Sequence, residues 1–557
     1  MIIIEYRYRK FANVSYIATY EASSVPNHLQ YHPSNYYFTT ALLRSITDSE
    51  RTSAFRQTQK LLSHKIEALH DIEVAEGIVS SLLLHLGYIL NKGCEEHLND
   101  IGSIFSLLGM VYQCSVKAKT ISVQQSGEDI FRMMSSAFHS VRYTESFDWC
   151  TFHILKVLRS LSRTRVASTA MVKTEETLDI IRIVILDDES NLGTKLDAVA
   201  TLKNITYYVD DKRLQILNHP GLIDALIKLC TVHGDEMGKE FASAVMRNLA
   251  MTPTTKVPMM KYSCLIDVLV ELTEDPDVKT RRNAVSAIGS LAIAVENSFT
   301  FVTHGEGIVV RTMKRLVETE EDSIIRRRAA RALRCFGRKE TVDIIIDCRG
   351  IVDTLCNAAM RDTSVEARIE AIEALACYVS HANEMSPYYN RMLDAMVNIG
   401  NSSLPPSCIE ALIKAFNTLT CFDRHRKPMA DHPGLLRTLS IIAMNQKKSS
   451  TCLEQVASAF YNISQDESAR EQLSKPHILP LLVTIGSTAC ENDDDNALAR
   501  SYANLAIVNA AIPESNRTQM AKENGLLNSL IQFASTSEDS EWKESVKATI
   551  IKLIPRL

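Results

Sequence analysis

A repeat of about 43 residues constrains the fold of this chain more than any other feature of its sequence. The segments NHPGLIDALIKL at 218–229 and DHPGLLRTLSII at 431–442 place His219 and His432 213 residues apart, which is about five units of that length. A second ladder of motifs, LKNI, MRNL, IGSL, LRCF, LACY, FNTL, FYNI and YANL, recurs in steps of 41 to 45 residues. The last residues of these motifs are Ile205, Leu249, Leu291, Phe336, Tyr378, Leu419, Ile463 and Leu505. Such a period predicts stacked helical units.

Each motif ends a helix with one apolar face. Counted from the last residue of the motif, positions −7, −4, −3 and 0 carry small or apolar residues, which share one side of a helix. Alanine is frequent at positions −7 and −4, as at Ala329 and Ala332. Because a small side chain lets neighbouring helices approach closely, we expect these faces to pack against one another.

Start and corner signals divide each unit further. A glycine precedes the second apolar helix in five units, and we expect it to turn the chain in the left-handed conformation: Gly221, Gly307, Gly350, Gly434 and Gly525. Asp277, Ser323 and Ser364 stand where N-caps of the long third helices are expected.

Composition agrees with a helical chain. Only 19 glycines and 15 prolines occur in 557 residues, which leaves few turns for a strand-rich fold. The sequence shows neither a transmembrane stretch nor a secretory signal, and its 13 cysteines include no C-x-x-C, so we expect an intracellular protein of the cytoplasm or nucleus. A net charge of −5 means that any nucleic-acid or membrane-surface binding needs a local basic patch.

The sequence predicts three parts. Residues 1–45 show no helical pattern and are expected to form a poorly ordered or peripheral segment. Residues 46–190 have irregularly spaced helical periodicity, which predicts degenerate repeats that cap the array. Residues 191–557 hold about eight to nine regular units. An acidic run at 491–495 is expected to be an exposed loop between helices.

This ladder resembles the armadillo repeat, in which a short first helix, a glycine corner and a second helix precede a long third helix ending in a small-x-x-A-L-x-N-L pattern. HEAT repeats have a similar period, but the glycine corner and the asparagine before the last residue favour armadillo. The resemblance implies an all-α fold, a right-handed superhelical α-α solenoid of armadillo-like repeats. It also implies that the third helices line a concave groove that binds a partner.

The asparagine column is the first candidate binding feature. Armadillo proteins use it to hold the backbone of an extended peptide, and four of eight units have it here: Asn204, Asn248, Asn462 and Asn504. The alternative is that asparagine merely suits an exposed turn near the helix end. Nuclear-import adaptors of this family carry tryptophan four residues earlier. Here no tryptophan stands there, which argues against recognition of an import signal by stacked tryptophans.

A basic stripe is the second candidate binding feature. Its four arginines lie within about 40° of the direction opposite the core face of one third helix: Arg327, Arg331, Arg334 and Arg338. Lys203, Arg247 and Arg282 take similar offsets in preceding units. The stripe predicts a site for an acidic peptide, a phosphorylated segment or a nucleic-acid backbone. The alternative is an ion-pair ladder with Glu370 and Glu373 of the next unit and Glu240 of an earlier one.

Other reactive residues have structural interpretations. His219 and His432 belong to the corner motif, with no second ligand at metal spacing. Cys335 and Cys377 are expected to fill space, with redox sensitivity as the alternative. Because no nucleotide-binding, hydrolase or zinc-protease motif occurs, we expect no catalytic residue, metal or cofactor.

The sequence therefore predicts a non-enzymatic scaffold that binds a protein or peptide segment, with an acidic segment as one option, in the groove of the third helices. The competing interpretation is a binder of nucleic acid, phosphoinositide or another anionic ligand through the stripe from Arg327 to Arg338. We rank nucleic acid below a protein segment. Partner identity and oligomeric state are left open.

Overall fold

The computed structural model describes residues 72–92, 98–231, 235–383, 387–445, 449–487, 496–537 and 539–556. Over these ranges every regular element is a helix and none is a strand, so the chain is an all-α solenoid, as expected. The segment 1–45 and the acidic run at 491–495 lie outside the described residues.

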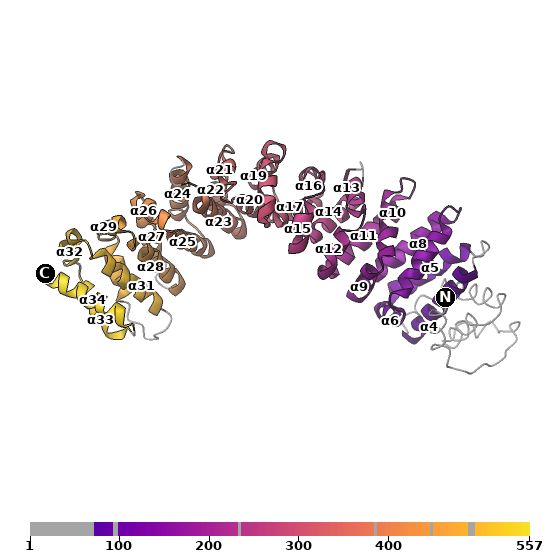
Figure 1. Cartoon of the computed structure of the whole chain (residues 1–557), viewed down its shortest axis with the longest axis horizontal. Coiled ribbons are helices and arrows are strands. Elements are labelled where there is room, and N and C mark those ends of the chain that lie inside the picture. The colour runs from indigo at the N-terminus through magenta and orange to yellow at the C-terminus, as the bar shows by residue number, and fades with distance from the viewer. Residues whose placement is uncertain are drawn as a thin grey trace. The chain divides into compact units, whose positions relative to one another are not determined.

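The chain forms two compact units, Met1–Val209 and Asp210–Leu557. In the first unit, α8 packs between α5 and α11 (Figure 1). The described helices of this unit are α4 (Ile72–Lys92), α5 (Leu98–Cys114), α6 (Val116–Ser126), α7 (Asp129–Val141), α8 (Phe147–Leu161), α9 (Arg165–Lys173), α10 (Glu175–Leu186) and α11 (Leu192–Tyr208). The predicted division at 190 stays a prediction.

The second unit is built from repeats of up to three helices. Its short first helices are α12 (Arg213–Leu217), α15 (Pro253–Met259), α18 (Val295–Thr303), α21 (Val342–Ile346), α26 (Asp423–Asp431), α29 (Arg470–Leu473) and α32 (Glu514–Met520). Its second helices are α13 (Leu222–Thr231), α16 (Leu265–Leu272), α19 (Ile308–Thr319), α22 (Ile351–Arg361), α24 (Pro387–Gly400), α27 (Leu435–Asn445), α30 (Leu479–Gly486) and α33 (Leu526–Thr536).

The third helices form a continuous stack within the second unit, because each packs against the next from α14 to α31 (Figure 1). They are α14 (Glu236–Met251), α17 (Val278–Leu291), α20 (Ser323–Phe336), α23 (Val365–His381), α25 (Pro406–Thr420), α28 (Ser450–Ser464), α31 (Ala497–Ala510) and α34 (Ser540–Leu553).

Small residues set the spacing of this stack. Ala284, Ala329 and Ala332, at the predicted core positions, are fully buried. A Cβ built on Gly289 of α17 would lie 3.8 Å from the Cβ of Ala332 on α20. The two helices therefore meet almost backbone to backbone, as the alanine-rich face predicts.

The corner and cap predictions are confirmed with two exceptions. Four of the five corner glycines have a positive φ, but Gly434 does not. Asp277 and Ser364 cap α17 and α23 through hydrogen bonds to main-chain N–H groups. At α20 the cap is Asp322, which accepts from the N–H of Ile325, and Ser323 is the first helical residue. The carboxylate also pairs with an arginine of α17, which a serine hydroxyl could not do.

The predicted register of the α31 unit is wrong by five residues. Leu498, expected in the core, is 56% exposed, and Asn504, expected at the groove, is fully buried. The helix continues past YANL to Ala510, and the later segment IVNA fits the pattern instead. In this register the core positions fall on fully buried alanines and the asparagine column falls on a half-buried residue: Ala503, Ala506, Asn509 and Ala510.

Replacing Ala332 by leucine should destabilise the stack. The added methylenes would press against Gly289, so we expect a loss of about 1–3 kcal/mol in the free energy of unfolding. Denaturant unfolding measures this loss. Ala548→Leu, at an exposed position of α34, is the control and should change little. Equal stability of the two variants would contradict the assigned core face.

Candidate functional site

Asparagines of the column connect consecutive third helices. In the first unit, Asn204 donates its Nδ2 to Ser162 Oγ at 3.0 Å. In the second unit, Asn462 Nδ2 donates to Thr420 Oγ1 at 3.2 Å, and Asn509 Nδ2 donates to Ser464 Oγ at 2.9 Å. Each acceptor stands just after the motif that ends the preceding third helix. These amide nitrogens therefore serve the stack, although each side chain stays half-buried rather than buried.

Two of the predicted column residues are buried in the second unit. Asn248 is 2% exposed and accepts a hydrogen bond from Arg247 Nη2 at 3.0 Å. Asn504 donates to the carbonyl of Gly486 at 3.2 Å, and its Oδ1 accepts from Ser529 Oγ at 2.9 Å. The structure thus brings Asn504 into a core network.

Two of the flanking basic residues bind side chains of the following repeat. Arg247 Nη1 donates to Asn283 Oδ1 at 2.8 Å, and Arg282 Nε donates to Asp322 at 3.1 Å. Lys203, on α11, is half-buried and has an interaction of its own. Arg247 and Arg282 therefore do not extend the basic stripe as free positive charges in the second unit.

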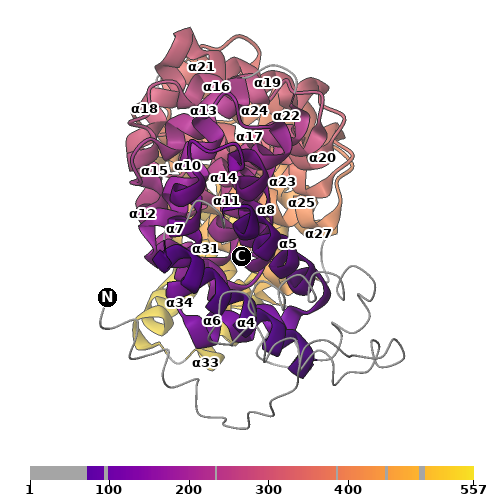
Figure 2. The same cartoon turned by 90° about the vertical axis from the view of Figure 1, so that its right-hand side faces the viewer.

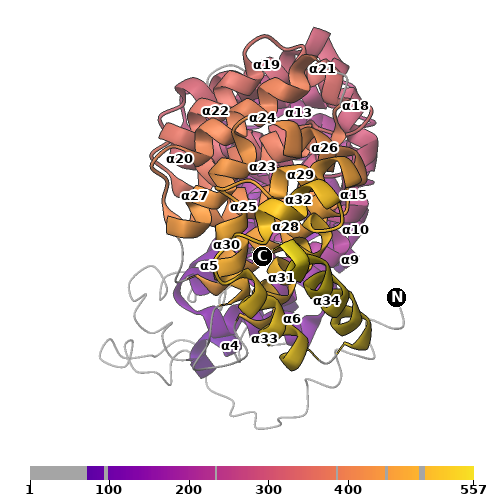
Figure 3. The same ribbon diagram turned by 90° about the vertical axis from the view of Figure 1, so that its left-hand side faces the viewer.

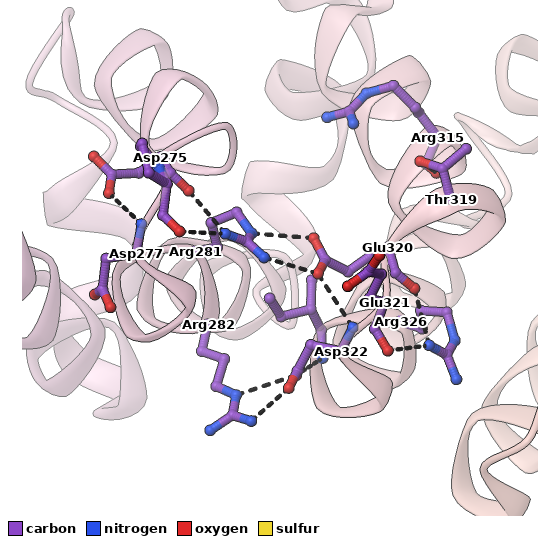
Figure 4. A network of polar contacts seen from close by, with 12 residues as sticks. Asp275, Asp277, Arg281, Arg282, Arg315, Thr319, Glu320, Glu321, Asp322 and Arg326 are labelled. Carbon is purple, nitrogen blue, oxygen red and sulfur yellow. Dashed lines mark hydrogen bonds and ion pairs between the residues drawn. The ribbon is translucent and has the colours of Figure 1, made fainter.

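A network that the sequence reasoning missed ties successive third helices at their beginnings (Figure 4). Arg281 binds the Glu320 carboxylate at 3.0 and 3.1 Å and donates to the carbonyl of Asp275 at 2.9 Å. Arg326 repeats both contacts with Asp362 and the carbonyl of Glu320. Although burial opposes it, hydrogen bonding to Arg281 holds the pKa of Glu320 below its usual range.

A sequence signal for this network exists. Arg281, Arg326 and Arg368 each stand ten residues before the last residue of a motif, and each donates to the main-chain carbonyl six residues earlier. An arginine that recurs at one repeat position indicates a structural role, because the main-chain carbonyl group six residues before it is present in every repeat.

Arg334 and Arg338 of the stripe are engaged within the chain. Arg334 Nη2 lies 3.1 Å from Glu370 Oε2, and its Nη1 pairs with Glu373. Burial raises the pKa of the Glu370 carboxyl, while Arg334 opposes this shift. Arg338 donates to the carbonyl of Ile293 at 3.4 Å. The ion-pair alternative thus describes Arg334, and Glu240 pairs with Lys279 at 3.7 Å.

Arg327 and Arg331 have no such partner. Among the described residues none forms an ion pair or hydrogen bond with either side chain, and Arg331 is exposed. Their surroundings hold charges of both signs. Glu370 attracts both arginines, which oppose the rise in its pKa that burial causes, and Glu366 attracts Arg327. Burial and nearby arginines lower the pKa of Arg328, and burial, with a contribution from Arg331, lowers the pKa of Lys256, which is 8% exposed. An anion at Arg331 would relieve this repulsion.

The remaining candidates have structural roles. Burial raises the pKa of the Cys335 and Cys377 thiols, which disfavours a reactive thiolate. His432 Nε2 lies 3.0 Å from Asp394 Oδ1 of the preceding second helix. Within the described ranges, no group of histidine, cysteine, aspartate and glutamate side chains could hold a metal ion, and no helix is long and apolar enough to cross a membrane.

Comparison with known proteins supports the fold. No family model and no curated protein matches the sequence. Among solved structures, an engineered protein aligns with a TM-score of 0.51 at 19% identity, covering 82% of this chain and 98% of its own. A chain from work on a conserved phosphorylation switch that controls the interaction between cadherin and beta-catenin aligns with a TM-score of 0.56 at 12% identity. That alignment covers 93% of this chain and all of the other. It is an armadillo-type solenoid, and the fold described above belongs to the same all-α class.

Replacing Asn504 should cost more stability than replacing Asn509. Asn504→Ala would leave the fully buried hydroxyl of Ser529 without its acceptor, at a cost of about 1–3 kcal/mol. Asn509→Ala would remove one half-exposed hydrogen bond, worth about 0.5–1.5 kcal/mol. Denaturant unfolding of both variants measures the difference. The reverse order would contradict the corrected register.

Proposed function

We propose that this chain is a non-enzymatic protein-interaction scaffold of the armadillo superfamily that binds a partner segment along its third helices. The single observation that carries the proposal is Arg331, an exposed guanidinium in the middle of a basic stripe that makes no ion pair or hydrogen bond with a described residue. Uncompensated positive charge on one helix costs stability, and a negatively charged partner would offset that cost.

Two further observations support a protein partner. The overall net charge of −5 does not favour binding of a long polyanion. The solved armadillo-type chain comes from work on an interaction between two proteins, cadherin and beta-catenin. The half-exposed asparagines Asn204, Asn462 and Asn509 each keep a carbonyl oxygen that could accept from the backbone of a bound segment.

Two variants test the binding role and the structural role of the stripe separately. We expect Arg327→Gln combined with Arg331→Gln to weaken binding of a partner recovered with the full chain, because each lost charge-assisted hydrogen bond costs about 1.5–3 kcal/mol. The melting temperature should fall little, since neither arginine makes an ion pair or hydrogen bond with a described residue.

Arg334→Gln is the matched control. It would leave the Glu370 carboxylate, which is 16% exposed, without its cation, so it should lower stability by about 1–3 kcal/mol and affect binding less. Unchanged affinity of the Arg327 and Arg331 variant, measured by isothermal calorimetry, would refute the basic site.

A polyanion is the second candidate, and the same unpaired arginines favour it. A nucleic-acid ligand should lose affinity steeply with salt, with a log–log slope of about −0.9 for each phosphate contact. We expect titration of single-stranded DNA and of duplex RNA, followed by fluorescence anisotropy, to give no specific binding at physiological salt. Tight binding with a steep slope would replace the protein-partner proposal by the polyanion one.

A further inference from the structure

Exposed apolar side chains gather beside the basic stripe. Eight residues after the motif ends of α14, α17 and α20 stand Val257, Phe299 and Ile344, on the first helices of three consecutive repeats. Other exposed apolar residues lie where a third helix ends and the next first helix begins. We call the whole set the first-helix ridge, with exposed fractions of 40% to 58%: Met251, Val257, Ile293, Val295, Phe299 and Ile344.

The ridge follows the stack of repeats. The helices α15 and α18 pack against each other, and Figures 2 and 3 both place them on the same side of the second unit. Asn297 of α18 donates to the carbonyl of Lys256 on α15 at 3.1 Å, which fixes the two helices relative to each other. Their exposed residues Val257 and Phe299 therefore belong to one surface. Soluble proteins rarely gather exposed apolar side chains in this way without a binding role.

The ridge also borders the basic stripe. Arg338, the last stripe residue, donates to the carbonyl of Ile293 at 3.4 Å. Ser298, the neighbour of Phe299, donates to the carbonyl of Cys335 on α20 at 3.5 Å. Arg338 also takes the repeat position that Met251 and Ile293 hold in the two preceding repeats. This position, two residues after the motif end, is therefore apolar in those repeats and basic where the stripe ends.

The charges near the ridge indicate which occupant fits. Glu296 and Asp343 are exposed on α18 and α21, beside Val295 and Ile344, and these two acids would repel an anionic lipid surface. On the stripe side, positive charge comes from Arg331 and Arg338. A complementary partner is therefore apolar over the ridge and acidic over the stripe.

We propose that the first-helix ridge and the basic stripe form one docking surface for an amphipathic helical segment of another protein. The apolar face of that segment covers Val257, Phe299 and Ile344, and its acidic flank meets Arg331. This inference rests on the proposed function, because it uses the same stripe, and extends it from an anionic contact to a partner of defined amphipathic pattern.

A designed peptide tests the inference directly. The probe is a fluorescent peptide of about four helical turns, with leucines at helical spacing on one face and glutamates on the adjoining flank. We expect it to bind the full chain, measured by anisotropy. A peptide with lysine in place of glutamate should bind at least about tenfold more weakly, because each charge-assisted contact is lost.

Variants then separate the two halves of the surface. Phe299→Ser and Ile344→Ser should each weaken peptide binding about fivefold, because apolar area would no longer be buried. Ile441→Ser on α27, 40% exposed against 43% for Ile344, lies outside the ridge and should leave affinity unchanged. Arg331→Gln should weaken binding and flatten its salt dependence. Melting curves should be unaltered in all four variants, because each side chain is exposed.

Three results would overturn the inference. The first is failure of the acidic amphipathic peptide to bind the unaltered chain. The second is binding that depends on Arg331 but not on Phe299 or Ile344, which would leave the proposed function standing and remove only the ridge. The third is Phe299-dependent binding to vesicles of phosphatidylcholine and phosphatidylserine without binding of the peptide, which would make the ridge a membrane contact.

Discussion

The close approach of successive third helices is the constraint on which the second unit depends. At Gly289 and Ala332 two helices meet with no side chain larger than a methyl group between them. This contact fixes the spacing of the repeats, and it also fixes which residues on neighbouring helices can reach each other. Polar side chains at equivalent positions of successive repeats then lie at similar distances from one another, so the same type of interaction can recur along the stack.

The chain uses this geometry to turn polar residues inward, toward its own neighbouring repeats. The amide nitrogens of Asn462 and Asn509 donate hydrogen bonds to hydroxyl groups of the preceding repeat. Arg281 and Arg326 bind carboxylates of the following repeat. These bonds are half-buried, so each is worth more than an exposed pair. A residue pattern that resembles a peptide-binding column thus stabilises the stack first, and only its unused acceptors remain for a ligand.

Sequence alone was sufficient to predict the period, the all-α class and the core face, because these follow from a local helical spacing that recurs in every repeat. It failed where two local patterns compete. Both YANL and IVNA satisfy the motif, and only packing shows that Leu498 is exposed while Ala503 is buried. It also missed the pairing of Arg326 with Asp362, 36 residues later, since such a partner is decided by the stacking distance and not by local spacing. For the stripe, the sequence left both interpretations open because the answer differs between Arg334 and Arg331.

That difference is the strongest argument for function. The carboxylates of Glu370 and Glu373 lie within reach of Arg334, and Asp322 is already engaged by Arg282. Arg331, one turn from Arg334, forms no ion pair with a described acid: Glu370 attracts it without a direct contact, and Lys256 adds positive charge nearby. A scaffold optimised only for stability would place an acid or a neutral residue there, because like charges one turn apart destabilise a helix by a few tenths of a kcal/mol. Local rules that are broken without an internal gain mark functional positions. The absence of a direct contact to Arg331 among the described residues is therefore the reason why we propose a partner at this position.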